Sequence, residues 1–549
     1  MTQPTSELNL PWVPQTLRIP RQDRTHFAQP RLPDACEQID ENHAALAAST
    51  VNVQGRSLAE LRRWSRESVV AAARQYTHEL TGAVIDETPL DRLIVAGHQP
   101  TLFHPGVWAK NFALNNLTAR HDGVGLNLVV DNDTFSSTSI RVPVGTRKHP
   151  AIASIAFDEP RPTQPWEDAP ILDAKAFDSF AERVAGAMSG WGVEPLIASM
   201  WSGAVAQREK SGRLADSLTA ARLQLERSWG LTNLELPISR MCELEPFHWF
   251  AGHLLAELPR FHRIHNEALL EYRLINKVRS QAHPVPDLKQ LGEWLEAPLW
   301  VWRRGDMQRG RVFARQFGRE MELSDGTTSF ARFPLDQQME SCCCVEALQQ
   351  LRAEGVHLRT RALTTTLFSR LCLGDLFIHG IGGAKYDEMT DHIISRVFGI
   401  HPPHFLTLSA TLHLGIAEPF DVQTADENRL QTLLRDLQYH SERHLAPGDA
   451  AELVAEKQSL IAQQHAVRSR GLSRSKRRTH RHQNRERFRR LQQVNAALSE
   501  QTRDQQSDAH AELETLRAEL AANAVLTDRE FPFCLYAEER IRPFLSAGQ

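Results

Sequence analysis

The loop at residues 97–106 holds the side chains best suited to chemistry in this sequence. It reads Gly-His-Gln-Pro-Thr-Leu-Phe-His-Pro-Gly, so His98 and His104 share one loop. The loop separates a short apolar run at 93–96, typical of a buried strand, from a helical stretch at 107–119. Free backbone N–H groups and the positive end of the helix dipole favour an anion at such a junction. Four neighbours complete the predicted anion site: Gly97, Gln99, Lys110 and Asn111.

The two histidines predict catalysis as well as binding. Each could donate a hydrogen bond to a bound phosphate, or to negative charge that develops in a transition state. We therefore predict catalytic roles for His98 and His104. The loop matches neither the Walker A nor the GxGxxG pattern. The alternative is a structural turn whose histidines bond to backbone carbonyls.

A second polar cluster, Asp131, Asn132 and Asp133, follows a segment at 126–130, Leu-Asn-Leu-Val-Val, that is typical of a strand. Its carboxylates could accept a proton from an incoming amine, bind a ribose hydroxyl or hold a divalent cation. We predict catalytic roles for Asp131 and Asp133 and a binding role for Asn132. The alternative is an Asx-rich turn.

A third cluster follows the apolar run at 376–379 and is rich in glycine, which lets a backbone approach a ligand closely. Arg361, upstream of this run, could bind a carboxylate with its guanidinium fork. The predicted binding residues in and before this loop are Arg361, Gly380, Gly382, Gly383, Tyr386 and Asp387.

The elements that must position these clusters form a strand–helix–strand unit, which predicts parallel strands in an α/β fold. Ligands of open parallel sheets bind at the carboxyl ends of the strands, where the predicted clusters lie. Alternating residues at 299–302 and 311–315 predict an antiparallel insertion. The chain then divides into four parts: a leader and helix at 1–90, a core at 91–420 with an insertion around 150–330, a helical arm at 421–525, and a segment at 526–549 that returns to the core.

The arm contains the strongest charge asymmetry of the chain. Almost every residue from 424 to about 523 is a helix former, and heptad-like leucines predict two long helices folded back as an antiparallel coiled coil. Residues 468–490 carry eleven Lys or Arg and one Glu, although the whole chain has a formal net charge of −4. Phe488 is the single aromatic residue of this basic segment, so base stacking on nucleic acid is not indicated.

Composition sets the remaining limits. The 549 residues are 41% hydrophobic and 24% charged, as in globular proteins, and no run of about 18 apolar residues predicts a membrane helix. Seven cysteines, three of them adjacent at 342–344, suit neither a disulfide framework nor a zinc site. We expect a cytoplasmic protein without a bound metal, and the role of the three adjacent cysteines stays open.

Three motifs, in chain order, resemble those of the bacillithiol-synthesis cysteine-adding enzymes, the BshC family. The loop at 97–106 is similar to that family's G-Q-Q-x-x-L-x-x-G-P loop, with His98 in place of a glutamine and His104 added. Residues 131–133 resemble its E-D-x-D segment, and residues 381–386 resemble its G-G-x-G-E-x-x-Y loop, with Lys385 in place of an acid. The resemblance assigns site roles to the following positions: His98, Gln99, Asp131, Asp133, Gly382, Gly383 and Tyr386.

The resemblance implies a Rossmann-like core, inserted connecting elements and a coiled-coil arm through which two copies form a homodimer. It implies a ligase that adds cysteine to the amino group of an amino-sugar conjugate, glucosaminyl-malate, in low-molecular-weight thiol synthesis. The anion site could hold ATP or another nucleotide, and the sequence leaves the cofactor open. Two alternatives remain: a nucleotidyl- or glycosyl-type transferase on the same core, and a non-catalytic, nucleic-acid-associated scaffold that uses the basic segment.

Overall fold

The computed structural model shows a mixed α/β protein whose chain divides into two compact units. The first unit contains the residues up to Val144, Ile152–Leu414 and the residues from Arg529 on, and the second contains Gly145–Ala151 and Gly415–Asp528. The structure describes residues 7–12, 17–85, 88–135, 137–280, 282–468 and 476–547. Within these ranges, every helix is too short or too polar to cross a bilayer.

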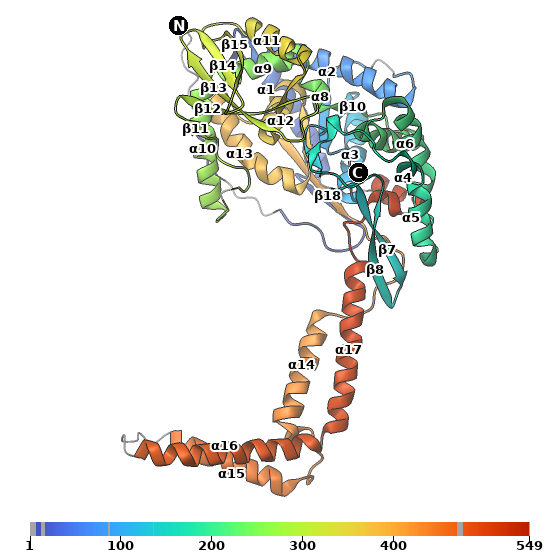
Figure 1. Cartoon of the computed structure of the whole chain (residues 1–549), viewed down its shortest axis with the longest axis vertical. Coiled ribbons are helices and arrows are strands. Elements are labelled where there is room, and N and C mark those ends of the chain that lie inside the picture. Colours follow the sequence, from blue (N-terminus) through green and yellow to red (C-terminus); the bar gives the residue numbers. More distant parts are fainter. Residues whose placement is uncertain are drawn as a thin grey trace. The chain divides into compact units, whose positions relative to one another are not determined.

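A six-stranded sheet forms the centre of the first unit (Figure 1). In spatial order its strands are β1 (Thr25–Gln29), β18 (Phe405–Thr411), β17 (Leu376–His379), β4 (Leu93–His98), β5 (Val124–Val129) and β10 (Leu234–Pro237). All neighbours are parallel except β1, which pairs antiparallel with β18. The chain proceeds outward from β4 through β5 to β10, and then returns to place β17 and β18 on the other side of β4. The strand order therefore reverses between β4 and β17, which is where open parallel sheets bind ligands.

The predicted strand–helix–strand unit is confirmed, because β4 and β5 are parallel and joined by α3 (Pro105–Arg120). His104 caps α3, and Pro105 follows at the first helical position, where its missing N–H costs nothing. Helix α2 (Leu58–Thr81) begins at a capping box between Ser57 and Glu60, and ends at Gly82 in the left-handed conformation.

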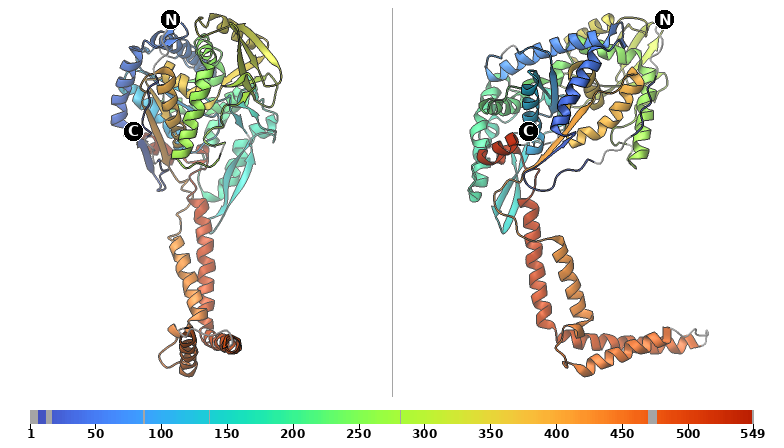
Figure 2. Two further views of the ribbon diagram at one scale, coloured as in Figure 1. Left: turned by 90° about the vertical axis from the view of Figure 1, so that its left-hand side faces the viewer. Right: turned by 180° about the vertical axis from the view of Figure 1, so that it is seen from behind.

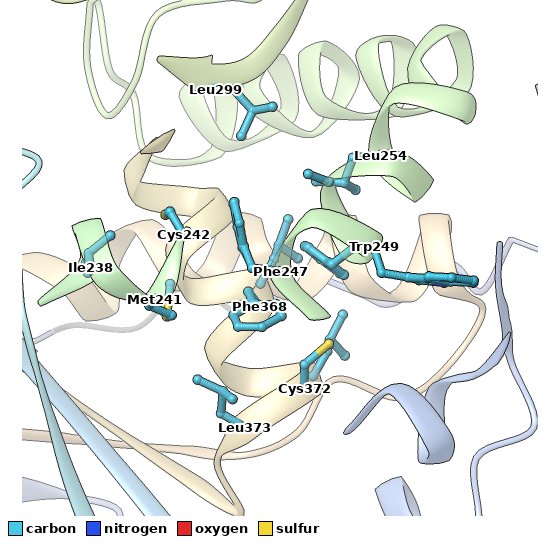
Figure 3. Packing of buried hydrophobic residues seen from close by; sticks show 14 of the residues in the cluster. Ile238, Met241, Cys242, Phe247, Trp249, Leu254, Leu299, Phe368, Cys372 and Leu373 are labelled. Carbon is cyan, nitrogen blue, oxygen red and sulfur yellow. The ribbon is translucent and has the colours of Figure 1, made fainter. Parts of the chain in front are cut away.

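The largest buried apolar cluster joins the sheet to the helices that cover it. It includes Leu93 and Val95, alternate residues of β4 that share one face of the sheet, together with residues of α2 and of α13 (Ile381–Phe398). Figure 3 shows its interior around Phe247, Phe368 and Cys372. Burial on this scale fixes the strand ends that carry the polar loops.

The predicted antiparallel element is confirmed as a second sheet. Its strands are β11 (Gln290–Leu291), β12 (Trp294–Arg303), β13 (Gly310–Phe317), β14 (Glu320–Ser324) and β15 (Ser329–Pro334), and β16 (Val356–Thr360) pairs with β12. The insertion is not continuous, however, because β10 lies within the range predicted for it and pairs with β5 of the central sheet. The four residues 234–237 read Leu-Glu-Leu-Pro, and so short a segment with one acid and a proline did not mark β10 in the sequence.

The other elements of the first unit connect these sheets. The helices are α1 (Leu32–Ala47), α4 (Ala174–Asp178), α5 (Phe180–Met188), α6 (Ile197–Ser211), α7 (Leu214–Ser228), α8 (Ile238–Met241), α9 (Glu245–Ala256), α10 (Leu258–Ile275), α11 (Cys342–Ala353), α12 (Ala362–Phe368), the π-helical turn η3 (Ser369–Leu373) and α18 (Glu538–Ala547). The short strands are β2 (Asn52–Val53), β3 (Arg56–Ser57), β6 (Thr134–Phe135) and β9 (Gln164–Pro165), and β7 (Ser139–Thr146) forms a hairpin with β8 (His149–Ala156), whose tip belongs to the second unit.

In the described residues of the second unit, four α-helices take the place of the two long ones predicted. Helix α14 (Thr424–Tyr439) lies beside α17 (Arg503–Leu526), and α15 (Ala451–Arg468) lies beside α16 (Lys476–Glu500) (Figures 1 and 2). The prediction of continuous helices is wrong because a segment with Pro447 and Gly448 separates α14 from α15 and a turn ends α16. In the basic segment, residues 469–475 and the side chains of Arg477, Arg478 and Arg481 lie outside the described residues.

Candidate active site at the carboxyl ends of β4 and β17

Two of the three predicted loops meet where the strand order reverses. They line a cavity of about 320 Å³, which we name the switch-point cavity. Its polar and glycine lining includes Gly97, His98, Gln99, Lys110, His379, Gly380 and Gly383. The loops after β4 and β17, which are far apart in sequence, therefore form one site.

Lys110 supplies a buried positive charge to this cavity. Its Nζ donates a hydrogen bond to the carbonyl oxygen of Gly97 at 2.5 Å. Among the described residues, no carboxylate forms an ion pair with Lys110, and burial lowers its pKa to about 8. An unpaired, buried ammonium group near the N-terminus of α3 is suited to bind an anion.

His379, the last residue of β17, lies beside a buried carboxylate. Its Nε2 is 2.6 Å from Oδ2 of Asp387, which also accepts from Nη1 of Arg370 at 2.9 Å. Burial alone would raise the pKa of Asp387, but the charges of His379 and Arg370 outweigh it and hold the pKa below its usual range. A Cβ on Gly383 would lie 2.8 Å from Nδ1 of His379, so this glycine makes room for the ring. Nε2 of His379 makes no well-aligned hydrogen bond within the described residues, so the contact with Asp387 is one of charge. An imidazole beside an ionised carboxylate is an arrangement used for general base catalysis.

The ring of His98 is already engaged by the protein. Its Nδ1 lies 3.1 Å from the carbonyl oxygen of Gln99, and its Nε2 lies 3.1 Å from the amide groups of both Asn111 and Asn127. Burial, followed by the charge of Arg222, lowers the pKa of His98 well below its usual value, so the ring is neutral. His98 therefore fixes the end of β4 and offers little hydrogen-bonding capacity to a ligand.

A buried charge network lies beneath His98. Arg222 donates to both Glu226 and Glu235 at 2.9–3.0 Å, and these carboxylates accept from Asn111 at 2.8 Å and Asn127 at 2.9 Å respectively. The predicted binding residue Asn111 thus connects His98 to this network and does not line the cavity. The network holds α3 and the strands β4, β5 and β10 in register beside the switch-point cavity.

His104 acts as the cap of α3 and does not line the switch-point cavity. Its Nδ1 accepts from the backbone N–H of Gly106 at 3.1 Å, and its Nε2 lies 3.6 Å from a carboxylate oxygen of Glu530. A Cβ on Gly106 would lie 2.4 Å from the carbonyl oxygen of Ala410, so Gly106 allows α3 to approach β18.

The three residues of the acidic cluster after β5 have different neighbours. Gln99 donates from Nε2 to Oδ2 of Asp133 at 2.5 Å, so Asp133 lies next to the first loop. Arg309 pairs with the other oxygen of Asp133 at 3.1 Å. Asn132 is buried and donates to the carbonyl oxygen of Thr360 at 2.8 Å. Adjacent side chains at the end of a strand point to opposite sides, which separates these roles.

Asp131 faces a different cavity, at the carboxyl ends of β5 and β10. It accepts from the backbone N–H of Ser239 at 2.9 Å and from the Ser239 hydroxyl. Burial first, and then the charge of Glu167, raise the pKa of Asp131 to about 7. Asp131 is therefore not positioned to act in the switch-point cavity.

The three remaining predicted residues lie outside this cavity. Arg361 donates from Nη1 to Oε1 of buried Glu296 at 2.6 Å and lines a separate cavity of about 230 Å³. Tyr386 packs against the large apolar cluster. Gly382 has no atom within 4 Å of the place where its Cβ would lie, so its lack of a side chain is not required by neighbours.

Comparison with protein-family models and with curated proteins gives no match for this chain. What the site can do is therefore inferred from its own geometry. The buried ammonium group of Lys110 can bind an anion, and the imidazole of His379 beside the carboxylate of Asp387 can transfer a proton. Sequence reasoning missed His379. The available signal was its place as the last residue of an apolar run, the same place that His98 has in β4.

Replacing Asp131 by Asn is expected to stabilise the protein increasingly as the pH rises from about 4 to 7. When a carboxyl has a raised pKa in the folded state, the free energy of unfolding of the protein falls as the pH rises from the unfolded-state pKa through the folded-state pKa. Asn cannot ionise, so the gain reaches about 4 kcal/mol, because one pKa unit corresponds to about 1.4 kcal/mol. Urea denaturation at pH 4 and pH 8 measures the difference in free energy of unfolding between the variant and the wild type, with exposed Asp178→Asn as the control. Equal gains at both pH values would contradict the raised pKa.

Proposed function

We propose that this chain is a BshC-like ligase that joins an amine to a carboxylate, with cysteine and an amino-sugar conjugate as its substrates. The observation that carries the proposal is the switch-point cavity, where Lys110 and the His379–Asp387 pair flank the two segments, 97–106 and 381–386, that resemble motifs of that family. The strand order supports a Rossmann-like core, because the strands follow the order 3-2-1-4-5 when numbered along the chain from β4.

In this proposal the carboxylate substrate binds at Lys110. The ammonium group and the backbone N–H groups of the loop at 97–106 hold the carboxylate, and then stabilise the oxyanion of the tetrahedral intermediate. Condensation of a free carboxylate with an amine is unfavourable in water, so the carboxylate is first activated. ATP or another nucleoside triphosphate is the proposed activator: a carboxylate oxygen bonds to its terminal phosphorus, the bond from that phosphorus to the bridging oxygen breaks, and the nucleoside diphosphate leaves. Phosphate is then the group that the amine displaces.

The amine must lose a proton to attack. Its nitrogen forms the new C–N bond and gives the tetrahedral intermediate, Nδ1 of His379 accepts the proton, and the C–O bond to phosphate then breaks. Among the described residues, none forms a hydrogen bond with Nδ1, while Asp387 lies on the Nε2 side and stabilises the imidazolium that forms. Lys110 thus takes the anion-stabilising role predicted for His98 and His104, and His379 takes the proton-accepting role predicted for Asp131 and Asp133.

We also propose that the helices of the second unit form a coiled-coil arm that supports a homodimer. Antiparallel pairing supports this, since Arg517 near the end of α17 bonds to Glu427 near the start of α14 at 2.8 Å. Leu430, Leu513 and Leu516 are buried between these helices. Sedimentation of the full chain at several concentrations tests the dimer.

Replacing His379 by Asn is expected to lower kcat about 10²–10⁴-fold, the usual contribution of a general base. The assay incubates the enzyme with ATP, cysteine and glucosaminyl-malate, and measures the thiol product by mass spectrometry. Lys110→Met is expected to raise the KM of the carboxylate substrate, because it removes the charge that binds it. His262→Asn, on the surface of α10, is the matched control. Wild-type turnover in the His379 variant would refute the proposed role.

A further inference from the structure

A second cavity, which the proposed function does not use, opens at the carboxyl ends of β5 and β10. Its volume is about 710 Å³, more than twice that of the switch-point cavity. Asp131 and Ser239 lie at the strand ends, and Glu167, His357 and Arg359 form its buried part. We name it the β5–β10 cavity.

The buried part of the β5–β10 cavity has more carboxylates than cations. Arg359 donates to both oxygens of Glu167, at 2.8 and 3.0 Å, and to Glu243 at 3.2 Å. Arg352, which is more exposed, pairs with the other oxygen of Glu243 at 3.0 Å, while Asp131 and Asp168 form no ion pair with an Arg or Lys among the described residues. Burial raises the pKa of Glu167, and burial together with the charge of Glu167 raises that of Asp131, as expected where negative charge is not balanced.

One buried polar group in this part of the cavity, Nε2 of His357, lacks a hydrogen-bond partner within the described residues, and a ligand could supply it. His357 is 7% exposed, and its Nε2 is buried without a hydrogen bond in the described part of the chain. It lies 3.8 Å from Oδ1 of Asp168, too far for a hydrogen bond, while the other oxygen of Asp168 accepts from Trp302 at 2.9 Å. A buried donor without a partner is costly, which points to an oxygen atom of a ligand beside His357.

A metal ion does not explain this arrangement, although Glu167, Asp168 and His357 offer atoms within 4.8 Å of one another. Arg359 donates from Nη2 to Nδ1 of His357 at 3.0 Å, so the lone pair of Nδ1 is in use. The neutral ring then carries its proton on Nε2 and has no lone pair left for a cation. The Nε2–H group is a donor that faces Asp168.

The mouth of the β5–β10 cavity has the opposite charge. Arg213 and Arg304 line it, are exposed, and form no ion pair within the described residues. Arg304 is close enough for its charge to lower the pKa of His357, after burial and Arg359. Free guanidinium groups at the mouth are suited to a carboxylate or a phosphate.

We propose that the β5–β10 cavity binds a small zwitterion, with its amine against Asp131 and Asp168 and its anionic group against Arg213 and Arg304. His357 donates from Nε2 to an oxygen of the ligand. The charge separation of the cavity, negative inside and positive at the mouth, selects a molecule with both charges over one with either alone. This inference is independent of the proposed ligase activity.

The test measures binding to the full chain by isothermal titration calorimetry. Phosphoethanolamine and γ-aminobutyrate are the zwitterionic probes, and they distinguish a phosphate from a carboxylate at the mouth. Ethylamine, acetate and inorganic phosphate are the single-charge probes, and Mn²⁺ tests the metal alternative. We expect at least one zwitterion to bind about tenfold or more tightly than every single-charge probe.

Two variants locate the binding. Asp168→Asn is expected to weaken binding of the zwitterion about tenfold, because the amine of the ligand loses a charged partner. Asp178→Asn, an exposed acid outside the cavity, controls for charge, and the thermal melting of each variant confirms folding. The proposal is overturned if no zwitterion binds, if a single-charge probe or Mn²⁺ binds as tightly, or if folded Asp168→Asn binds like the wild type.

Discussion

Replacing Arg370 by Met is expected to lower the free energy of unfolding by about 3–5 kcal/mol, the cost of removing one partner from a buried ion pair. Arg370 lies in the π-helical turn η3 and is 2% exposed. It donates to Asp387 at 2.9 Å and to Asp391 at 2.6 Å, and also to the carbonyl oxygen of Pro403. Met keeps the aliphatic bulk but leaves these acceptors without their donor.

The pH dependence of this loss separates charge from packing. Burial already raises the pKa of Asp391 to about 6 in spite of Arg370, whereas the pKa of Asp387 is lowered, and both pKa values are expected to rise without Arg370. A raised folded-state pKa lowers the free energy of unfolding as the pH rises. The variant is therefore expected to lose more of its free energy of unfolding at pH 8 than at pH 5. Urea denaturation at both values measures the difference.

Arg319→Met is the matched control for Arg370. Arg319 pairs with Asp336 at 2.8 Å in the same unit, but its side chain is 73% exposed, and exposed pairs contribute about 0–1 kcal/mol. A loss in Arg370→Met no larger than in this control would show that the buried carboxylates do not need the guanidinium. The variant also loses the group that holds Asp387 against His379, so reduced turnover is expected in the fraction that folds.

Replacing Asp375 by Asn is expected to lower the free energy of unfolding by a similar amount, about 3–5 kcal/mol. Asp375 is fully buried before β17 and accepts from Arg62 at 2.6 Å, Arg66 at 2.8 Å and the backbone N–H of Leu93 at 2.7 Å. It therefore joins α2 to the starts of both strands that form the switch-point cavity. The amide removes the negative charge and leaves two buried guanidinium groups without a counterion.

The stability difference between Asp375→Asn and the wild type should narrow in acid. Burial would raise the pKa of Asp375, but the charges of Arg62 and Arg66 outweigh it and lower the pKa. A lowered folded-state pKa gives stability that is present above the unfolded value of about 3.9 and lost as pH falls through the folded value. Urea denaturation at pH 7 and pH 3 measures this, with Asp178→Asn as the control. An equal difference at both pH values would exclude the carboxylate charge as its cause.

Local patterns predicted the elements well. The apolar run at 93–96 became part of β4, the helical stretch at 107–119 became α3, and alternation at 299–302 marked β12. These patterns are set by neighbours two to four residues away, which the sequence displays directly. The helical arm was harder, because a heptad-like pattern continued across breaks that one proline and a few polar residues impose.

The composition of the site could be predicted only in part. Gly97, Gln99, Lys110, Gly380 and Gly383 were expected to bind a ligand, and the structure brings them to one cavity. His98 was expected to act on a ligand, but two asparagines engage its ring. A local motif gives the residue types at a strand end, whereas the partners of each side chain come from other elements.

The sequence by itself determined that strands end in polar loops and that a parallel α/β unit carries the first of them. Only the tertiary structure decided that β17 lies beside β4, which brings Lys110 and His379 to one cavity and sends Asp131 to another. The paired residues of β17 and β4 lie about 280 positions apart in the sequence. Burial of apolar faces drives this pairing, and because it is non-directional, the sequence does not show which strands will pair. Charged side chains such as Arg370 and Asp387 then pair with each other, because burial removes the water that would otherwise solvate their charges.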